Sequence, residues 1–393
     1  MADFNILLKL SNQELTQNNK AELYLSRPEM CALYQHTKTD EITDDFRLKY
    51  FKTPKSTSYP LDLNKGFEQY VFRRQQTQLQ LLNKVIKFIM EANENIIQQY
   101  SDSLKAETPK TVAASDAQPL PELEKSPVPP KRKLVVSQRG VLARFMLIPY
   151  RTRGSVYNNI TFYATRYRGI LHLSGNSEQN GHTKNDTYHG KFEQICFSDD
   201  TDLEPITDVP VEDNITTYAI FRSDIEEFDL LYSAEVSGVI SNHKINDIHN
   251  IDEIRKLNFI QTKVMWTREY NSKLSHPKCM QWWAQSYLAN TNDICIGRKD
   301  RDGFVRTPAQ IIKVKDIPKN QIWKPTVCIR FLYTILTLLD ETLSKVDDPH
   351  TVYDFIYDSY AGCIKWKVHN GKTKLSFLPD DYIKHCDDQT SSK

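Results

Sequence analysis

The chain has 393 residues, of which 51 are basic and 50 acidic, so its formal net charge is +1. This balance excludes nucleic-acid binding through a global excess of positive charge, and any such surface must arise from local clustering. The hydrophobic fraction of 39% suffices for a large core, and no apolar run is long enough to span a membrane. Because the first residues also lack the pattern of a secretory signal, we expect a soluble intracellular protein without membrane contact.

Composition divides the N-terminal third into three segments. Residues 1–45 are polar and weakly patterned, and we expect an arm that docks on the body. Residues 46–100 carry apolar positions at helical spacing over 67–99, which predicts an amphipathic helix. Residues 101–133 contain six prolines and no apolar periodicity, so we expect a disordered insertion. Its end, Pro129–Lys133, resembles a nuclear localisation cluster, although a solvated basic run explains it equally well.

Strands dominate the expected core at residues 134–385. Two helices interrupt them, Pro277–Leu288 and Pro325–Val346, each with proline in its first turn. This pattern predicts an α/β (α+β) fold, in which a mixed β-sheet core is flanked by helices in a single large domain, with a short tail at 386–393. The expected strands are Val141–Leu147, Tyr157–Tyr163, Arg168–Leu173, Phe228–Ile240, Leu257–Trp266, Asp293–Gly297, Gln310–Val314, Val352–Tyr357 and Cys363–Val368.

The seven cysteines are scattered without Cys-x-x-Cys spacing. Several lie inside apolar segments, such as Cys295 and Cys328, so we expect buried, reduced thiols. The ten histidines form no spaced pair either. The sequence therefore suggests no zinc site.

Two short segments in the expected strands have the pattern of a degenerate metal site. Glu235 and Ser237 alternate along one strand, and Gln261 and Lys263 along another, so we expect all four side chains on one face of adjacent strands. A two-metal phosphodiesterase would carry Glu-x-Asp and Glu-x-Lys here, because Mg²⁺ prefers anionic oxygen ligands. Ser237 and Gln261 are neutral where carboxylates are needed. The segments thus predict a nuclease scaffold that has lost its metal chemistry.

Further blocks surround these two segments in a fixed order. They are Leu61–Phe67, Gln138–Tyr150, Tyr188–Gln194, Lys278–Leu288, Asp302–Val305, Trp323–Cys328 and Phe377–Pro379. Together, over about residues 45–385, they resemble the DXO family of decapping RNA 5′-end hydrolases and exonucleases. Each block is weak alone, but agreement of so many in order is implausible by chance. The resemblance implies a DXO-like nuclease scaffold for the core.

The resemblance also implies roles for individual residues. Arg139, Lys263 and Gln285 would bind RNA phosphates, whereas without the resemblance Arg139 and Lys263 would be read as ordinary surface charges. Glu193 and Glu235 occupy metal positions. With the other carboxylates gone, we expect them to pair with Arg139 and Lys263 instead. We therefore expect no resident cofactor, and at most one weakly held Mg²⁺ when RNA is bound.

Two aromatic and basic groups could add to RNA binding. Trp282 and Trp283 are neighbours on a helix and therefore point in different directions, so we expect both to pack in the core. A second candidate RNA surface combines four arginines with two tyrosines, although a solvated strand edge explains it equally well. Its residues are Arg151, Arg153, Arg166, Arg168, Tyr163 and Tyr167.

Three functions compete. We expect a non-catalytic protein that binds the 5′ ends of single-stranded RNA and acts as a nuclear adaptor, protecting nascent transcripts from decapping, decay or termination. Degenerate relatives of this kind imply protein partners in a chromatin-associated complex for germline piRNA precursors. One alternative is an active metal-dependent RNA 5′-end hydrolase, which the neutral Ser237 and Gln261 disfavour. The other is a protein scaffold that no longer touches RNA, which the retained Arg139, Lys263 and Gln285 disfavour.

Overall fold

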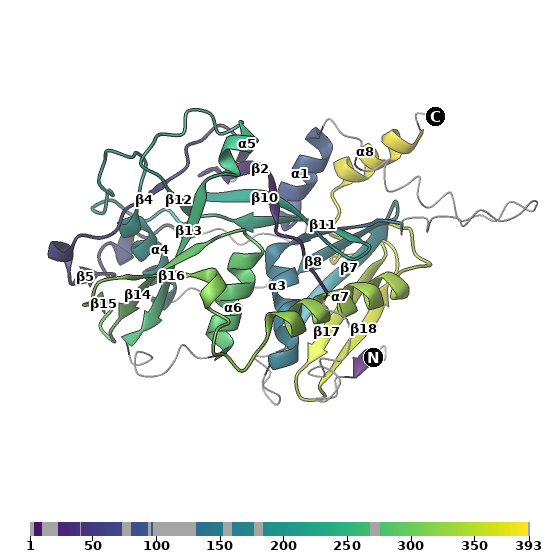
Figure 1. Ribbon diagram of the computed structural model, residues 1–393. Coiled ribbons are helices and arrows are strands. Elements are labelled where there is room, and N and C mark those ends of the chain that lie inside the picture. Colours follow the sequence, from purple (N-terminus) through teal and green to yellow (C-terminus); the bar gives the residue numbers. More distant parts are fainter. Residues whose placement is uncertain are drawn as a thin grey trace, which may run out of the picture.

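The computed structural model describes residues 4–9, 23–39, 41–72, 80–92, 96, 131–151, 159–176, 184–267 and 276–391. Within these residues the strands form two sheets, with the smaller at the left of Figure 1 and the larger at the right. Helices cover the larger sheet, and the architecture is mixed α+β. The expected fold class is confirmed.

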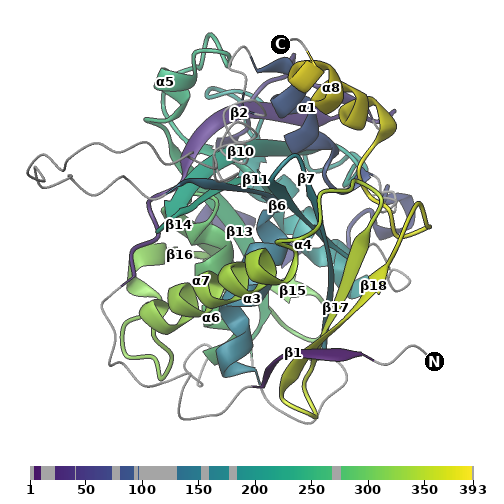
Figure 2. The same ribbon diagram turned by 90° about the vertical axis from the view of Figure 1, so that its right-hand side faces the viewer.

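The larger sheet has ten described strands, in the order β1-β18-β17-β7-β8-β6-β11-β10-β2-β3. β6 pairs in parallel with both of its neighbours, β8 and β11, and the other pairs are antiparallel. Figure 2 shows β1 beside the strands at one edge. The bounds are β1 Asn5–Lys9, β2 Glu29–His36, β3 Ile42–Thr43, β6 Lys133–Gln138, β7 Ile160–Tyr167, β8 Ile170–Gly175, β10 Thr216–Ile225, β11 Phe228–Glu235, β17 Val352–Asp358 and β18 Cys363–His369.

The smaller sheet follows the order β5-β15-β14-β13-β12-β4-β9 in the described residues, and β16 also pairs with β14. Its central strands, β13 and β14, run parallel, whereas β12 is antiparallel to β13. The bounds are β4 Tyr50–Phe51, β5 Leu61–Asp62, β9 Phe197–Ser198, β12 Gly238–Ile240, β13 Asn258–Trp266, β14 Asp293–Lys299, β15 Phe304–Val305 and β16 Gln310–Lys313.

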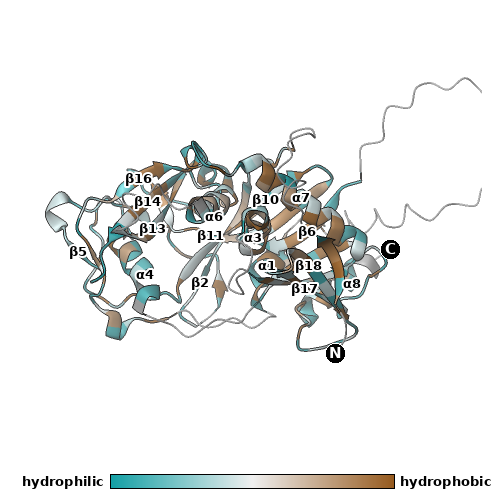
Figure 3. Cartoon of the chain, turned by 90° about the horizontal axis from the view of Figure 1, so that it is seen from below, coloured by the Kyte–Doolittle hydropathy of each residue, from teal (hydrophilic) through white to brown (hydrophobic). Residues whose placement is uncertain are grey.

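Helices cover both faces of the larger sheet (Figures 1 and 2). On one face lie α3 (Arg139–Leu147) and α7 (Pro325–Thr342), with α6 (His276–Tyr287) against α3; on the other lie α1 (Asn83–Glu91) and α8 (Asp380–Ser391). Both faces of the sheet need covering because apolar side chains point to each of them in turn along β6. Val135 packs in the hydrophobic cluster that contains α3, whereas Leu134 and Val136 pack in the cluster that contains α1 and α8. In Figure 3 the apolar segments gather in this region, whereas α4 (Lys184–Cys196) is mostly hydrophilic.

The segment Val141–Leu147 belongs to helix α3, so the strand expected there was wrong. All seven residues except Arg144 are buried. A short run that is apolar at nearly every position does not distinguish a buried strand from a buried helix. The helix begins at Arg139, directly after β6 ends at Gln138. Arg139 therefore lies at the carboxyl end of a sheet strand.

The continuous strand expected over Phe228–Ile240 is broken into two strands that belong to different sheets. β11 ends at Glu235 in the larger sheet, and β12 begins at Gly238 in the smaller one. A Cβ at position 238 would lie 2.4 Å from the carbonyl oxygen of Lys49, so glycine is needed for this crossing. The two residues between the strands, Val236 and Ser237, carry the chain from one sheet to the other.

Other expected segments are met in part. The first 45 residues include β2, an interior strand of the larger sheet. Of the helix expected over 67–99, residues 83–91 form α1, whereas Phe67–Gln69 form a 3-10 helix that ends at an extended Tyr70, so the expected beginning of the helix was wrong. Residues 97–130, most of the expected insertion, lie outside the described residues. The expected tail at 386–393 continues α8 as far as Ser391. The expected buried thiols are confirmed, since all seven cysteines are free and Cys31 alone is not fully buried.

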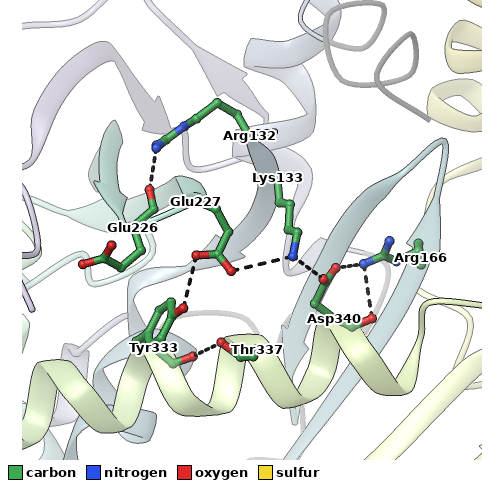
Figure 4. Close-up of polar contacts among 8 residues, drawn as sticks. All are labelled: Arg132, Lys133, Arg166, Glu226, Glu227, Tyr333, Thr337 and Asp340. Atoms are coloured by element: carbon green, nitrogen blue, oxygen red, sulfur yellow. Dashed lines mark hydrogen bonds and ion pairs between the residues drawn. The ribbon is translucent and has the colours of Figure 1, made fainter. Parts of the chain in front are cut away.

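Polar contacts attach α7 to the larger sheet (Figure 4). Lys133 of β6 lies 2.8 Å from a carboxylate oxygen of Asp340 and 3.7 Å from one of Glu227. Arg166 of β7 forms an ion pair with the same Asp340, and the Tyr333 hydroxyl donates to Glu227 over 3.2 Å. β7 lies between β17 and β8, so Arg166 does not lie on the solvated strand edge that was considered for it. The last basic residue of the Pro129–Lys133 cluster is likewise bound within the fold.

The other described arginines of the second candidate surface are Arg168, which forms an ion pair, and Arg151, which is half-buried. Arg168 pairs with Asp387 of α8 at 2.6 Å. Burial lowers the pKa of Arg151, which is half-buried. Arg153 lies outside the described residues.

Trp282 and Trp283 are both buried, as expected.

Acid should destabilise the fold through His172, a fully buried residue of β8 whose ring lies 3.0 Å from the Tyr382 hydroxyl of α8. Burial lowers the pKa of His172 to about 3. In the unfolded chain His172 therefore takes up a proton as pH falls through about 6.5, whereas in the folded chain it stays neutral until about pH 3. The free energy of unfolding should fall by about 1.4 kcal/mol per pH unit from this residue as pH drops from 6.5 toward 3.

Urea unfolding at several pH values between 7.5 and 4 tests this expectation. The variant His172→Gln should flatten the pH dependence, whereas His243→Gln, a change at an exposed histidine, should leave it unchanged. Equal slopes for the wild type and His172→Gln would contradict the assignment.

Among the helices that the structure describes, none combines the length and the apolar character that crossing a membrane requires.

Candidate functional site

The candidate site lies where β6 and β11 end. These strands run parallel with Ser233 opposite Gln138. Arg139, which follows β6, and Glu235, the last residue of β11, therefore meet at the same edge. The carboxyl ends of parallel strands are the usual place for a ligand in such sheets. Arg139 donates a hydrogen bond from Nη1 to the backbone carbonyl of Glu235 over 3.1 Å. Arg139 is also the first residue of α3, whose unpaired N–H groups favour an anion at this end.

The smaller sheet brings three further residues to this edge. Gly238 of β12 lies opposite Ile260 of the antiparallel β13, so Ser237 lies beside Gln261. Lys263 follows Gln261 on the same face of β13. The register therefore places the backbone of Ser237 near that of Gln261, whereas Glu235 reaches this region from the larger sheet. The single strand face expected for all four residues is thus a junction between two sheets.

Helix α4 supplies Glu193 by packing closely on the smaller sheet. The ring of Phe192 covers Gly297 of β14, where an added Cβ would lie 2.7 Å from the ring. Only glycine at 297 lets the helix approach this far. The isolated glycine in the expected strand Asp293–Gly297 was a sequence signal for such a close approach.

The carboxylate of Glu193 accepts two hydrogen bonds from hydroxyl groups. Its Oε2 lies 3.1 Å from Ser237 Oγ and 3.3 Å from Thr262 Oγ1. His189, one turn earlier on α4, donates from Nε2 to the backbone carbonyl of Thr262 over 2.9 Å. Sequence reasoning missed both Thr262 and His189, because their roles depend on how α4 lies on the sheet. Ser237 and Thr262 therefore both donate to the same carboxylate oxygen of Glu193.

Lys263 is the most perturbed cation of the site. Burial is the main reason why the pKa of Lys263 is lowered to about 8, and repulsion from Arg139 adds to it, while Glu235 and Glu193 oppose the change. By exposed area Lys263 is half-buried. A lysine whose pKa is lowered in this way is typical of a functional site.

Among the contacts described above, no hydrogen bond joins Gln261 or Gln285 to the carboxylate cluster around Glu193. Gln261 is buried in β13. Gln285 lies on α6, half-buried, and α6 packs against α3, the helix that begins at Arg139. The hydrogen bonds that join Glu193, Ser237 and Thr262 do not include it. A hydrogen bond from Arg139 to the backbone carbonyl of Glu235 joins these two residues.

The donors present do not fit a two-metal centre. Glu193 Oε2 already accepts from two hydroxyls, and Ser237 and Gln261 offer only neutral oxygens. Among the described residues, no group of three or more His, Cys, Asp or Glu side chains could hold a metal ion. Two divalent ions in one site need more anionic ligands than Glu193 and Glu235 supply. What the arrangement does offer is cationic donors beside a helix N-terminus, which suits a phosphate.

The family model described as RAI1-like PD-(D/E)XK nuclease matches residues 26–383. The chain belongs to this family. The expected resemblance to the DXO group is thereby confirmed. The family match does not assign individual residues, so the placement of Gln261-Thr262-Lys263 at the family's acidic-x-Lys pattern stays a prediction.

Two curated relatives illustrate the family. Protein cutoff of Drosophila melanogaster is 24% identical over 185 residues, which cover 46% of each chain. The human decapping and exoribonuclease protein is 25% identical over 264 residues, covering 63% of this chain and 64% of the relative. The chain thus matches about half of one relative's length and less than two thirds of the other's.

Two solved structures show the same fold. Rai1 of Candida albicans, in complex with pU5 and Mn²⁺, has a TM-score of 0.71 at 15% identity, covering 99% of this chain and 100% of the other. A triple variant of S. pombe Rai1, in complex with 3′-FADP, has a TM-score of 0.65 at 16% identity, covering 92% and 99%. At these identities the likeness establishes the RAI1-like fold alone.

Proposed function

We propose that this chain binds the 5′-phosphorylated end of single-stranded RNA and does not cleave it. One observation carries the proposal: Ser237 donates to the carboxylate of Glu193, while Arg139 and Lys263 stay at the same edge. The hydroxyl takes a position that a metal ligand would need, and the cations keep the attraction for phosphate. The site therefore keeps the cations that bind phosphate and lacks the carboxylates that would hold the catalytic metal ions.

Two related structures support this proposal. The Candida albicans Rai1 complex contains pU5 and Mn²⁺, so a protein of this fold accommodates such an RNA. In the S. pombe variant, one glutamate is replaced by serine and two by glutamine, and the variant is in complex with 3′-FADP. Ser237 and Gln261 are replacements of the same two kinds. Loss of carboxylates by such changes is compatible with a bound nucleotide in that relative.

RNA affinity should respond to pH through Lys263. Its ammonium form is the binding form, so affinity should fall as pH rises through about 8 and the residue loses its proton. The RNA phosphate does not contribute to this change, because its second ionisation lies near pH 6. Fluorescence anisotropy with a 5′-phosphorylated oligonucleotide between pH 7 and 9.5 measures the effect. Lys263→Arg should bind at pH 7 and lose the pH dependence, since arginine stays charged.

The same assay distinguishes the competing functions. Wild-type protein should prefer a 5′-phosphorylated RNA over the same RNA with a 5′-hydroxyl end. Equal affinity for both ends would reject the 5′-end binder and leave the scaffold alternative. Metal-dependent loss of the labelled RNA during the assay would instead favour an active hydrolase.

We further propose that the protein acts in the nucleus as an adaptor that protects nascent transcripts, in germline piRNA precursor production. The similarity to Protein cutoff supports this setting, and a Rhino- and Deadlock-like partner would give the locus specificity that an RNA end cannot supply. Affinity purification from nuclear extract should recover a stable protein partner that survives RNase treatment. Loss of every co-purifying protein with the RNA would reject the adaptor role.

A further inference from the structure

A pocket lies away from the 5′-end site, at the beginning of β13. It has a volume of about 670 Å³ and is lined by residues of α6, β13, β14, β16 and the segment around Arg27. Asn258, the first residue of β13, belongs to it and precedes Lys263 by five residues. At the rise of an extended strand this separates the two by about 17 Å. The pocket is therefore distinct from the site at Lys263.

A chain of hydrogen bonds crosses the wall of this pocket. Arg27 donates from Nε to Asn290 Oδ1 over 2.6 Å and from Nη2 to Asn292 Oδ1 over 3.1 Å. Asn292 donates to Asn258 Oδ1 over 3.2 Å, and Asn258 donates to Asp293 over 3.0 Å. The amide oxygens of all three asparagines thus accept from a neighbour in the wall.

The charges of the wall favour an anion. Three lining residues are basic, Arg27, Lys313 and Lys315, against one carboxylate, Asp293. Asp293 is fully buried, and Lys313 Nζ lies 2.7 Å and 3.0 Å from its two oxygens. Lys313 therefore neutralises the carboxylate, while Arg27 and Lys315 are left to balance a ligand.

The groups that remain for a ligand are donors beside an aromatic ring. Asn290 keeps its amide nitrogen, Arg27 has further N–H groups, and Lys315 carries an exposed ammonium. The carbonyls of Ser286 and Tyr287, at the end of α6, already accept hydrogen bonds from the backbone N–H groups of residues 289–291. They therefore do not present unsatisfied acceptors to the pocket. Tyr287 lines the same pocket, and its hydroxyl is fixed by donation to the carbonyl of Leu25 over 2.7 Å.

We propose that this pocket binds a nucleoside phosphate, with the phosphate on Arg27 and Lys315 and the base against Tyr287. Phosphate oxygens are acceptors only, which matches a wall whose own acceptors are satisfied. The base supplies the planar face that an aromatic ring stacks on, and the volume suits a small ligand. The nucleoside phosphate is either a free nucleotide or one unit of a single-stranded RNA. The pocket does not depend on the proposed 5′-end site.

Calorimetry with adenosine 5′-monophosphate tests the pocket in a full-length background that lacks the first site, Arg139→Ala with Lys263→Met. The nucleotide should still bind there. Adding Arg27→Gln and Lys315→Gln should weaken it at least about tenfold, because two charge-assisted contacts are lost. Lys315→Gln alone changes an exposed residue that will not disturb folding, and should weaken binding in the same direction. The matched control is Lys372→Gln, an exposed lysine outside the pocket that pairs with Asp380.

The outcomes separate this inference from the proposed function. No binding in the Arg139→Ala, Lys263→Met background, or binding that the Arg27 and Lys315 variants leave unchanged, would overturn the pocket while leaving the 5′-end site intact. Competition by a five-nucleotide RNA with a 5′-hydroxyl end would support the pocket and assign it to RNA. Nucleotide binding without such competition would support the pocket as a site for free nucleotide.

Discussion

Replacing Ser237 by Asp and Gln261 by Glu is expected to raise the affinity of this chain for Mn²⁺ by roughly 100-fold, at on the order of 1–3 kcal/mol for each added charged contact. The first change also frees Glu193 Oε2 from the Ser237 hydroxyl, so the site gains two carboxylates and releases a third. Divalent cations of this kind are held by such oxygens. Calorimetry without RNA measures the gain directly.

Thermal unfolding supplies an independent readout of the same variant. Without metal, the added carboxylates repel Glu193 and Glu235, so the melting temperature should fall below that of the wild type. Mn²⁺ should restore it, because a ligand that binds only the folded state stabilises that state. The matched control is Ser237→Asn with Gln261 unchanged, which adds similar bulk and no charge. No gain in metal affinity would mean that the site has drifted at more than these two positions.

Removing both cations, Arg139→Ala with Lys263→Ala, should weaken binding of 5′-phosphorylated RNA by a few kcal/mol, or about 100-fold or more, because each contact is charge-assisted. The same variant should bind RNA with a 5′-hydroxyl end as the wild type does. Loss of two phosphate contacts should also make the salt dependence shallower by about 1.4 in log–log slope. Anisotropy titrations at several salt concentrations measure all three quantities.

A control with the same change in net charge is available far from this edge. Lys372→Ala with Lys374→Ala removes two exposed cations and should leave both RNAs bound as in the wild type. If the control variant weakens binding as much as the Arg139 and Lys263 variant, the attraction is a diffuse field and no phosphate site exists at the sheet junction.

Much of this architecture could be predicted because local signals and burial agree. Pro325 begins α7 in the structure as its position in a first turn predicts. β13, β14, β17 and β18 lie within a residue or two of the predicted ranges, since their apolar runs are bounded by polar turns.

What could not be predicted depends on tertiary packing. The run Val141–Leu147 is apolar at almost every position, so it shows neither the 3.6-residue repeat of a helix nor the two-residue repeat of a strand, and α3 could not be identified from it. The break after Glu235 is hidden for a similar reason, because Val236 is as buried as the strand residues around it. The bond from Thr262 to Glu193 exists only because Gly297 lets α4 lie close to the sheet. These contacts join residues that are distant in sequence.

The most direct test of a binding site without cleavage follows one labelled RNA in one reaction for both outcomes. Wild-type protein is incubated with 5′-phosphorylated, 5′-triphosphorylated and 5′-hydroxyl RNA in Mg²⁺ and in Mn²⁺, and bound and hydrolysed fractions are measured together. We expect a bound fraction that is largest for the phosphorylated end and no product above background. Metal-dependent hydrolysis that disappears in a Glu235→Ala variant would contradict this expectation.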